Sequence, residues 1–300
     1  RLFLSLRTFS EVKKCALIRR LTDGNYSDLD PNNWSYIQAE SEHGCSFKYD
    51  GIILLLRENC CMGNGVKQIR PRSERGQISA TAVTYGHSLL GAPLLYFPAV
   101  QPDRDTGLII AGTHGDETTA VIALSCALRS LQPMQQRHHV ILAVNPDGCQ
   151  LGLRANSAGV DLNRNFPAAN WLPGHSVYRW NSASSERDVR LSSGDAAGSE
   201  PETQALCQLI HRLKPAWVVS LHEPLACVED PHQTLLGQQL SADFELPLVS
   251  NVGYETPGSF GSWCADLSLP CITLELPAIS ADLASEKYLP ALLALIDYDL

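Results

Sequence analysis

The alternation of two kinds of segment constrains the fold of this chain more than any other sequence feature. From residue 94 onward, short continuous apolar runs alternate with longer segments in which apolar residues recur at helical spacing. A continuous apolar run bounded by turn residues is typical of a strand that is buried on both faces. Strands that alternate with helices favour a largely parallel, mixed sheet. The sequence therefore predicts the α/β class: a single three-layer domain with helices on both faces of its sheet.

The expected elements can be given by residue range. Strands are expected at 94–100, 107–112, 139–144, 216–221, 248–252 and 271–276, and helices at 118–131, 199–213, 233–244, 259–267 and 281–296. Ser199 is the expected N-cap of its helix, and Asn-Pro-Asp-Gly at 145–148 predicts a turn. The connection from 149 to 199 is unusually long, and loops of that length in compact domains are usually functional or disordered.

Composition disfavours two classes of partner. The 300-residue chain carries a net charge of −9. Residues 1–61 contain eight Lys/Arg and eight Asp/Glu, so the remainder carries the whole excess of acid. An acidic body argues against nucleic acid as a partner. No apolar run approaches the roughly 18 residues of a membrane-spanning helix, so we expect no membrane partner. The sequence does not indicate an oligomeric state.

The segment before Met62, the first methionine, differs from the rest of the chain. It lacks a clear periodic pattern, and a polar, basic lead-in follows it. We therefore expect residues 1–61 to be a non-native or disordered N-terminal extension and residues 62–300 to form the working domain. The alternative is an N-terminal pro-segment.

Ten cysteines raise the question of disulfides. We expect mostly free thiols, because the chain has no Cys-x-x-Cys pair and no convincing secretory signal. Cys126, Cys207 and Cys271 also fall at core-like positions of predicted elements. Reduced cysteines are typical of a cytoplasmic protein.

Four residues that can carry chemistry lie at or near the ends of predicted strands. His114 and Glu117 follow one strand, His222 follows another, and Glu275 lies in the last. Two imidazoles and a carboxylate can fill three positions of a tetrahedral zinc site and leave the fourth for water. A second carboxylate beside that water suits metal-assisted hydrolysis. Sites in parallel sheets lie at the carboxyl ends of strands, which favours one shared site.

Taken alone, each of these residues has a plainer interpretation. A polar residue at a strand end is more often a cap or a surface group than a ligand. The spacing of His114 and Glu117 adds some weight, because residues three apart at a helix start share a face. The run 154–167 between them and His222 is dense in Arg and Asn, donors that suit carboxylate recognition and oxyanion stabilisation. A solvated loop with helix caps is the alternative for that run.

Several of these stretches together resemble one family. Gly-Thr-His-Gly-Asp-Glu, Asn-Pro-Asp-Gly, Gly-Val-Asp-Leu-Asn-Arg-Asn-Phe, the isolated His222 and Thr-Leu-Glu-Leu occur in the order found in the M14 zinc carboxypeptidases, over roughly 85–300. The resemblance implies one Zn²⁺ per chain and makes 62–300 a zinc carboxypeptidase-like catalytic domain. It also implies a cis peptide bond between Glu223 and Pro224.

The resemblance also implies a role for each motif residue. His114, Glu117 and His222 would bind zinc, and Glu275 would be the general base. Arg154 would stabilise the oxyanion, and Asp161 would orient the first zinc histidine. Asn163 and Arg164 would bind the terminal α-carboxylate of the substrate. Tyr254 corresponds to a mobile substrate-binding tyrosine, although its spacing is shifted by one residue, and a packing aromatic is the alternative.

Within the family, the stretches 145–170, 178–181, 198–216 and 252–267 are similar to bacterial amidases of cell-wall recycling. That similarity implies hydrolysis of the γ-D-glutamyl-meso-diaminopimelate bond in the murein tripeptide, a small peptide substrate, with release of diaminopimelate. Asp266, Glu229 and Asp230 are candidates for binding the second ammonium of diaminopimelate. The alternatives are a general metallocarboxypeptidase, a deacylase of acylated amino acids and a non-catalytic metal-binding module.

Overall fold

The computed structural model describes residues 36–38, 45–49, 52–56, 69–181 and 184–299. The chain divides into two compact units, Arg1–Lys67 and Gln68–Leu300. In the first unit, three strands form an antiparallel sheet in the order β1-β2-β3: β1 (Tyr36–Gln38), β2 (Cys45–Tyr49) and β3 (Ile52–Leu56). The expected start of the working domain at Met62 lies outside the described residues, so the interpretation of 1–61 stays a prediction.

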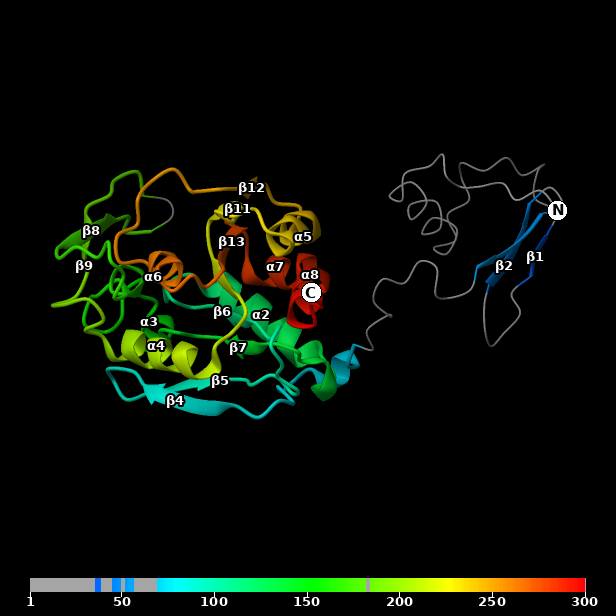
Figure 1. Cartoon of the computed structure of the whole chain (residues 1–300), viewed down its shortest axis with the longest axis horizontal. Coiled ribbons are helices and arrows are strands. Elements are labelled where there is room, and N and C mark those ends of the chain that lie inside the picture. Colours follow the sequence, from blue (N-terminus) through cyan, green and yellow to red (C-terminus); the bar gives the residue numbers. More distant parts are fainter. Residues whose placement is uncertain (1–35, 39–44, 50–51, 57–68, 182–183, 300) are drawn as a thin grey trace. The chain divides into compact units, whose positions relative to one another are not determined.

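The second unit is built on a six-stranded sheet in the order β12-β11-β13-β10-β6-β7 (Figure 1). Its only antiparallel neighbours are β11 and β13, and the other pairs are parallel. The prediction of a largely parallel, mixed sheet is therefore confirmed. The strands are β6 (Leu108–Ile110), β7 (His139–Ile141), β10 (Val218–His222), β11 (Leu225–Glu229), β12 (Leu248–Val249) and β13 (Cys271–Pro277).

Helices cover both faces of this sheet, so the predicted three layers are also confirmed (Figure 1). Strand alternation decides which side chains meet which helices. Val219 and Leu221 belong to the larger core on one face, whereas Val218 belongs to the core on the other. The first core includes residues of α2 (Thr118–Ser130), α5 (Leu235–Phe244), α7 (Ala281–Lys287) and α8 (Leu289–Ile296), and the second those of α4 (Pro201–Leu213) and α6 (Phe260–Asp266).

Three local expectations were wrong. The predicted turn at 145–148 is the start of α3 (Pro146–Leu151), because Asn145 Oδ1 accepts from Gly148 N at 2.9 Å and caps a helix. Ser199 is not the cap of α4: Glu200 holds that position, and the Ser199 hydroxyl donates to its carboxylate. The expected helix at 281–296 is two helices that meet at Tyr288, since Pro290 is placed where a second helix begins and has no N–H to continue the first.

The structure also contains elements that the sequence did not indicate. The long connection 149–199 holds a β-hairpin of β8 (His175–Tyr178) and β9 (Val189–Ser192). Strands β4 (Val83–His87) and β11 were not indicated either, and β4 pairs with β5 (Pro93–Tyr96), which corresponds to the strand expected at 94–100. Three short 3₁₀ segments also occur among the described residues: η3 (Arg72–Glu74), η4 (Pro133–Gln135) and η5 (Leu162–Arg164).

Two further expectations concern the described residues. Six cysteines are free thiols, in agreement with the sequence: Cys126, Cys149, Cys207, Cys227, Cys264 and Cys271. Of the helices that the structure describes, none has the length and apolar content needed to cross a bilayer.

Candidate active site

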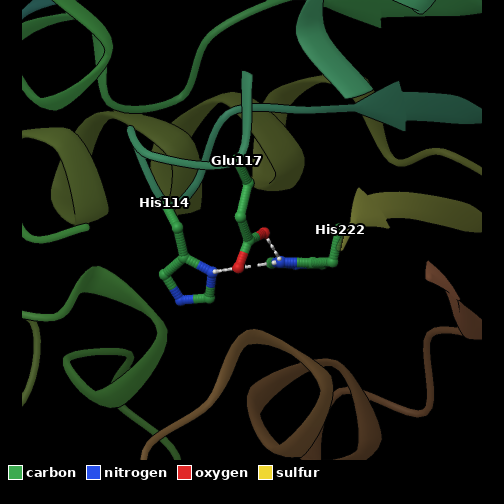
Figure 2. A group of neighbouring side chains, drawn as sticks. All are labelled: His114, Glu117 and His222. Carbon is green, nitrogen blue, oxygen red and sulfur yellow. Dashed lines mark hydrogen bonds and ion pairs between the residues drawn. The ribbon is translucent and has the colours of Figure 1, made fainter. Parts of the chain in front are cut away.

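His114, Glu117 and His222 converge on one point, and their ligand atoms all lie within 4.8 Å of one another. Figure 2 shows the Glu117 carboxylate between the two imidazole rings. Glu117 Oε1 lies 2.7 Å from His114 Nδ1, and Glu117 Oε2 lies 2.8 Å from His222 Nδ1. The two Nδ1 atoms are 3.2 Å apart. Two nitrogens and one carboxylate at this separation form an incomplete tetrahedral set of the kind that zinc prefers.

The sheet brings these residues together. His222 is the last residue of β10, and His114 follows the neighbouring strand β6. The expectation that His114 and Glu117 share a helical face was wrong, because Glu117 is the N-cap of α2 and His114 precedes the helix. The intervening Gly115 allows a close approach to α3: a Cβ there would collide with the backbone of Gly148.

The ring nitrogens that face away from this point are held by polar groups. His114 Nε2 lies 3.3 Å from Asp161 Oδ1, and His222 Nε2 lies 3.0 Å from Ser220 Oγ. With Nε2 placed against a polar group, Nδ1 is the nitrogen that each ring can offer to a metal once the proton on it is released. Both imidazoles therefore present Nδ1 to the same point, so the residues present fit a bound zinc ion. Ser220 had no signal in the sequence, because a serine within an apolar strand resembles any other buried hydroxyl.

Charge within the cluster is closely balanced. Burial and Arg154 lower the pKa of His114, but the carboxylates of Glu117 and Asp161 outweigh them and raise it to about 9. Burial raises the pKa of the Glu117 carboxyl, but the two histidines outweigh burial and hold this pKa well below the usual range. In the metal-free cluster, Glu117 is therefore ionised at neutral pH and His114 holds a proton. Metal binding would release that proton.

Arg154 and Glu275 lie beside this cluster. Arg154 Nη1 donates to Glu117 Oε1 at 2.8 Å, and its guanidinium lies 3.8 Å from the ring centroid of Tyr178. Glu275 is 9% exposed, and its Oε2 accepts from Leu225 N at 3.3 Å. Burial raises the pKa of Glu275 above the ordinary value for glutamate, and neighbouring Glu117 adds to the shift. A carboxylate with a raised pKa is a stronger base than an ordinary glutamate, which favours removal of a proton from a nearby water.

The remaining predicted site residues occupy two segments. Asp161 caps η5 by accepting from Asn163 N at 3.0 Å. Asn163 Oδ1 accepts from Phe260 N at 2.9 Å, which leaves the amide nitrogen to offer to a ligand. Arg164 Nη1 donates to the Asn163 carbonyl at 2.6 Å. Tyr254 is 57% exposed, unlike a packing aromatic.

Eight of the nine predicted site residues line one cavity of about 1380 Å³, and Asp161 lies behind it against His114. The cavity also includes residues that sequence reasoning missed, among them Tyr178 on the unexpected β8–β9 hairpin and Asp116 between the two ligand positions of one motif. The expected cis peptide bond between Glu223 and Pro224 is confirmed.

Comparison with known proteins agrees with this geometry. The family model described as zinc carboxypeptidase matches residues 74–233. Murein peptide amidase A of Escherichia coli (strain K12) is 68% identical over 227 residues, which are 76% of this chain and 94% of that protein. Murein peptide amidase A of Vibrio campbellii is 55% identical over 229 residues, which are 76% of this chain and 92% of that protein.

Solved structures extend the comparison. The murein-tripeptide amidase MpaA from Escherichia coli O157 matches with a TM-score of 0.76 and 66% identity, over 78% of this chain and 99% of that one. Bovine thrombin-activatable fibrinolysis inhibitor matches with a TM-score of 0.56 and 19% identity, over 72% of this chain and 88% of that one, and shows only the shared fold. From its sequence match, its fold and the convergence of its candidate ligand residues, this chain belongs to the zinc carboxypeptidase family.

Proposed function

We propose that this chain is a zinc-dependent amidase that hydrolyses the γ-D-glutamyl-meso-diaminopimelate bond of the murein tripeptide and releases diaminopimelate. The observation that carries the proposal is the meeting of His114, Glu117 and His222 at one point, with Glu275 in the same cavity. The extensive identity to the murein peptide amidases supports this substrate over other peptides.

One zinc ion per chain is the proposed cofactor, held by His114 Nδ1, His222 Nδ1 and the Glu117 carboxylate. When bound, zinc lowers the pKa of a bound water and polarises the scissile carbonyl. Asp161 and Ser220 hold the far nitrogens of the two imidazoles, so both rings are already oriented before the ion arrives.

Glu275 is the proposed general base, which takes a proton from the attacking water and returns one to the leaving amine. Its position in the same cavity as His114 and His222 supports this role, and burial raises the pKa of its carboxyl, which makes the carboxylate a stronger base. Arg154 is the proposed partner of the developing oxyanion. Its contacts with Glu117 and Tyr178 hold the guanidinium at the cavity wall.

Asn163 and Arg164 are proposed to bind the α-carboxylate of the last residue. A guanidinium recognises a carboxylate through paired hydrogen bonds, and that contact would confine cleavage to the final amide bond. Tyr254 is proposed to contact bound substrate, which its exposure at the cavity supports.

A cytoplasmic location is part of the same proposal. The six described thiols are unpaired, which is the state expected in a reducing compartment. The released diaminopimelate could then be reused where it forms.

The decisive experiment joins metal analysis to an assay of Glu275→Gln on the murein tripeptide. We expect the variant to bind zinc normally and to lose turnover by a factor on the order of 10³ or more, since a general base is removed while the ligands remain. Retained turnover with bound zinc would remove Glu275 from the mechanism. Equal hydrolysis of ordinary C-terminal peptides by the unmodified protein would instead indicate a general metallocarboxypeptidase.

A further inference from the structure

Three carboxylates were candidates for binding the second ammonium of diaminopimelate, and the structure separates them. Asp230 is 1% exposed, and its Oδ2 accepts from the backbone N and the hydroxyl of Thr234, at 2.6 and 2.7 Å. It therefore stabilises the N-cap of α5. Asp266 accepts from Ala169 N at 2.6 Å and does not line the cavity. Glu229 is the only one of the three that lines the cavity.

Strand register defines where Glu229 lies relative to the catalytic residues. Glu275 pairs with His222 on one side and with Cys227 on the other. Two residues back along β13, Thr273 pairs in the same way with Ser220 and Glu229. Side chains two residues apart on a strand share a face, so Glu229 lies on the same face as Glu275 and His222. The paired residues His222, Glu275 and Cys227 form one row across the sheet, and Ser220, Thr273 and Glu229 form the next. The two rows are separated by about 7 Å, the length of two residues in a strand.

The Glu229 carboxylate is only partly used by the protein. It is half-buried, and its Oε1 accepts from Val252 N at 3.2 Å. No lysine, arginine or histidine of the described ranges forms an ion pair with it. A half-buried anion without a cationic partner can gain much from a cationic ligand, because the pair is shielded from water.

The proposed substrate supplies a cation at a matching position. This step rests on the proposed function, in which the terminal residue of the substrate is meso-diaminopimelate. Its side chain carries an ammonium and a carboxylate beyond three methylene groups, a reach comparable to the step of about 7 Å between the two rows. With the scissile bond at the Glu275 row, this side chain would extend over Thr273 to the row of Glu229.

We propose that Glu229 is a specificity-determining residue whose carboxylate binds the terminal ammonium of diaminopimelate. Thr273 and Ser220 form the rest of this row, but the Ser220 hydroxyl contacts His222 Nε2, so Glu229 supplies the charge. A terminal residue without the ammonium leaves the carboxylate half-buried and unpaired. Sites that leave a polar group unpaired discriminate strongly against the wrong substrate.

The test compares two tripeptides on the zinc-loaded protein: one ends in meso-diaminopimelate, and the other in 2-aminopimelate, which lacks only the far amine. For Glu229→Gln we expect kcat/KM on the diaminopimelate substrate to fall about 10- to 100-fold, as for loss of one charged hydrogen bond. The 2-aminopimelate substrate should change little. Glutamine keeps an oxygen for Val252 N, so the cavity wall retains its anchor.

Asp266→Asn is the matched control, because it removes the same charge from the surface, and it should leave the ratio of the two substrates unchanged. An equal fall on both substrates, or no fall on the diaminopimelate substrate, would overturn the assignment of Glu229. Calorimetry adds an independent readout: in a zinc-loaded Glu275→Gln background, Glu229→Gln should weaken binding of the diaminopimelate tripeptide alone. If the unmodified protein hydrolyses neither tripeptide, the proposed function fails, and the binding comparison still decides the role of Glu229.

Discussion

The centre of the cavity and its rim are built in opposite ways. At the centre, His114, Glu117 and His222 are 2%, 6% and 4% exposed, and each contacts further polar groups. At the rim, Tyr254 is 57% exposed and Trp180 is 78% exposed. The central residues are positioned by adjoining strands and a helix start, whereas the rim residues lie in connections. The difference indicates that the hydrolytic chemistry is preorganised and that contacts with the outer part of a substrate are adaptable.

The largest expected effect comes from removing a central ligand. His222→Ala should abolish zinc binding and lower turnover of the murein tripeptide to the background, because two remaining ligands do not make a stable site. Metal analysis after dialysis and an assay on the same sample would measure both effects. A variant that binds zinc at full stoichiometry would show that the centre is less dependent on its geometry than we infer.

Arg154 tests whether the centre stabilises the oxyanion as well as the metal. Arg154→Ala should lower kcat by about 10²- to 10³-fold, the usual effect of removing one oxyanion donor. Because Arg154 also contacts Glu117, zinc content has to be measured alongside the kinetics. A loss of activity that merely follows a loss of zinc would mean that Arg154 supports the metal site instead.

A substitution of Asp161 tests whether its contact with His114 Nε2 orients that imidazole for metal binding. Asp161→Asn keeps the shape of the side chain but weakens its hold on His114 Nε2, so zinc affinity should fall about 10- to 100-fold. Competition with a chelator of known affinity would measure the change. Unaltered affinity would show that the strand and loop alone orient His114.

Removing the metal should make the stability of the protein depend on pH through His114 and Glu117. Since the pKa of His114 is raised to about 9, its protonated form stabilises the metal-free protein below its ordinary pKa near 6.5, and this contribution is lost as the pH rises through 9. Glu117 acts in the opposite sense: its lowered pKa gives stability above about 4.5 that is lost in acid.

Thermal unfolding between pH 6.5 and 9.5 would measure this effect. The melting temperature of the metal-free protein should fall over that range more steeply than that of the zinc-loaded protein, because ligand nitrogens that hold a metal no longer titrate. Parallel curves for the two forms would contradict the prediction.

The rim should give the smallest effects. Tyr254→Phe removes one hydroxyl from an exposed side chain, so we expect a change in kcat/KM of about 10-fold or less and no change in zinc content or melting temperature. A large loss of stability would show that Tyr254 is a packing residue and would weaken the contrast between rim and centre.

Much of the architecture could be predicted because it depends on local patterns. Buried parallel strands are continuous apolar runs, and β6, β10 and β13 fall where such runs occur. The errors have local causes as well. The apolar pattern at 281–296 predicts one continuous helix although Pro290 divides it, and Asn-Pro-Asp-Gly predicts a turn at 145–148, since a turn and a first helical turn use the same residues. The β8–β9 hairpin gave no clear signal, because its strands are short and largely solvated.

The candidate site likewise has residues that motifs predict and residues that only the fold brings to the cavity. All nine expected residues were found through motifs, and eight of them line one cavity. Ser220, Tyr178 and Glu229 carry no motif, and their places depend on strand register and on a hairpin packed against Arg154. Which of the three candidate acids faces the cavity could not be predicted, because neighbouring positions such as Glu229 and Asp230 differ only in the direction of their side chains.

The sequence by itself determined the class of fold and the candidate ligand set, because hydrophobic period and residue chemistry are local properties. Only the tertiary structure decided that both imidazoles present Nδ1 to one point, that Asp161 and Ser220 hold their far nitrogens, and that Glu229 lies one row from Glu275. The physical reason is that these relations join residues distant in the chain. Strand pairing and side-chain alternation establish them only when the sheet forms.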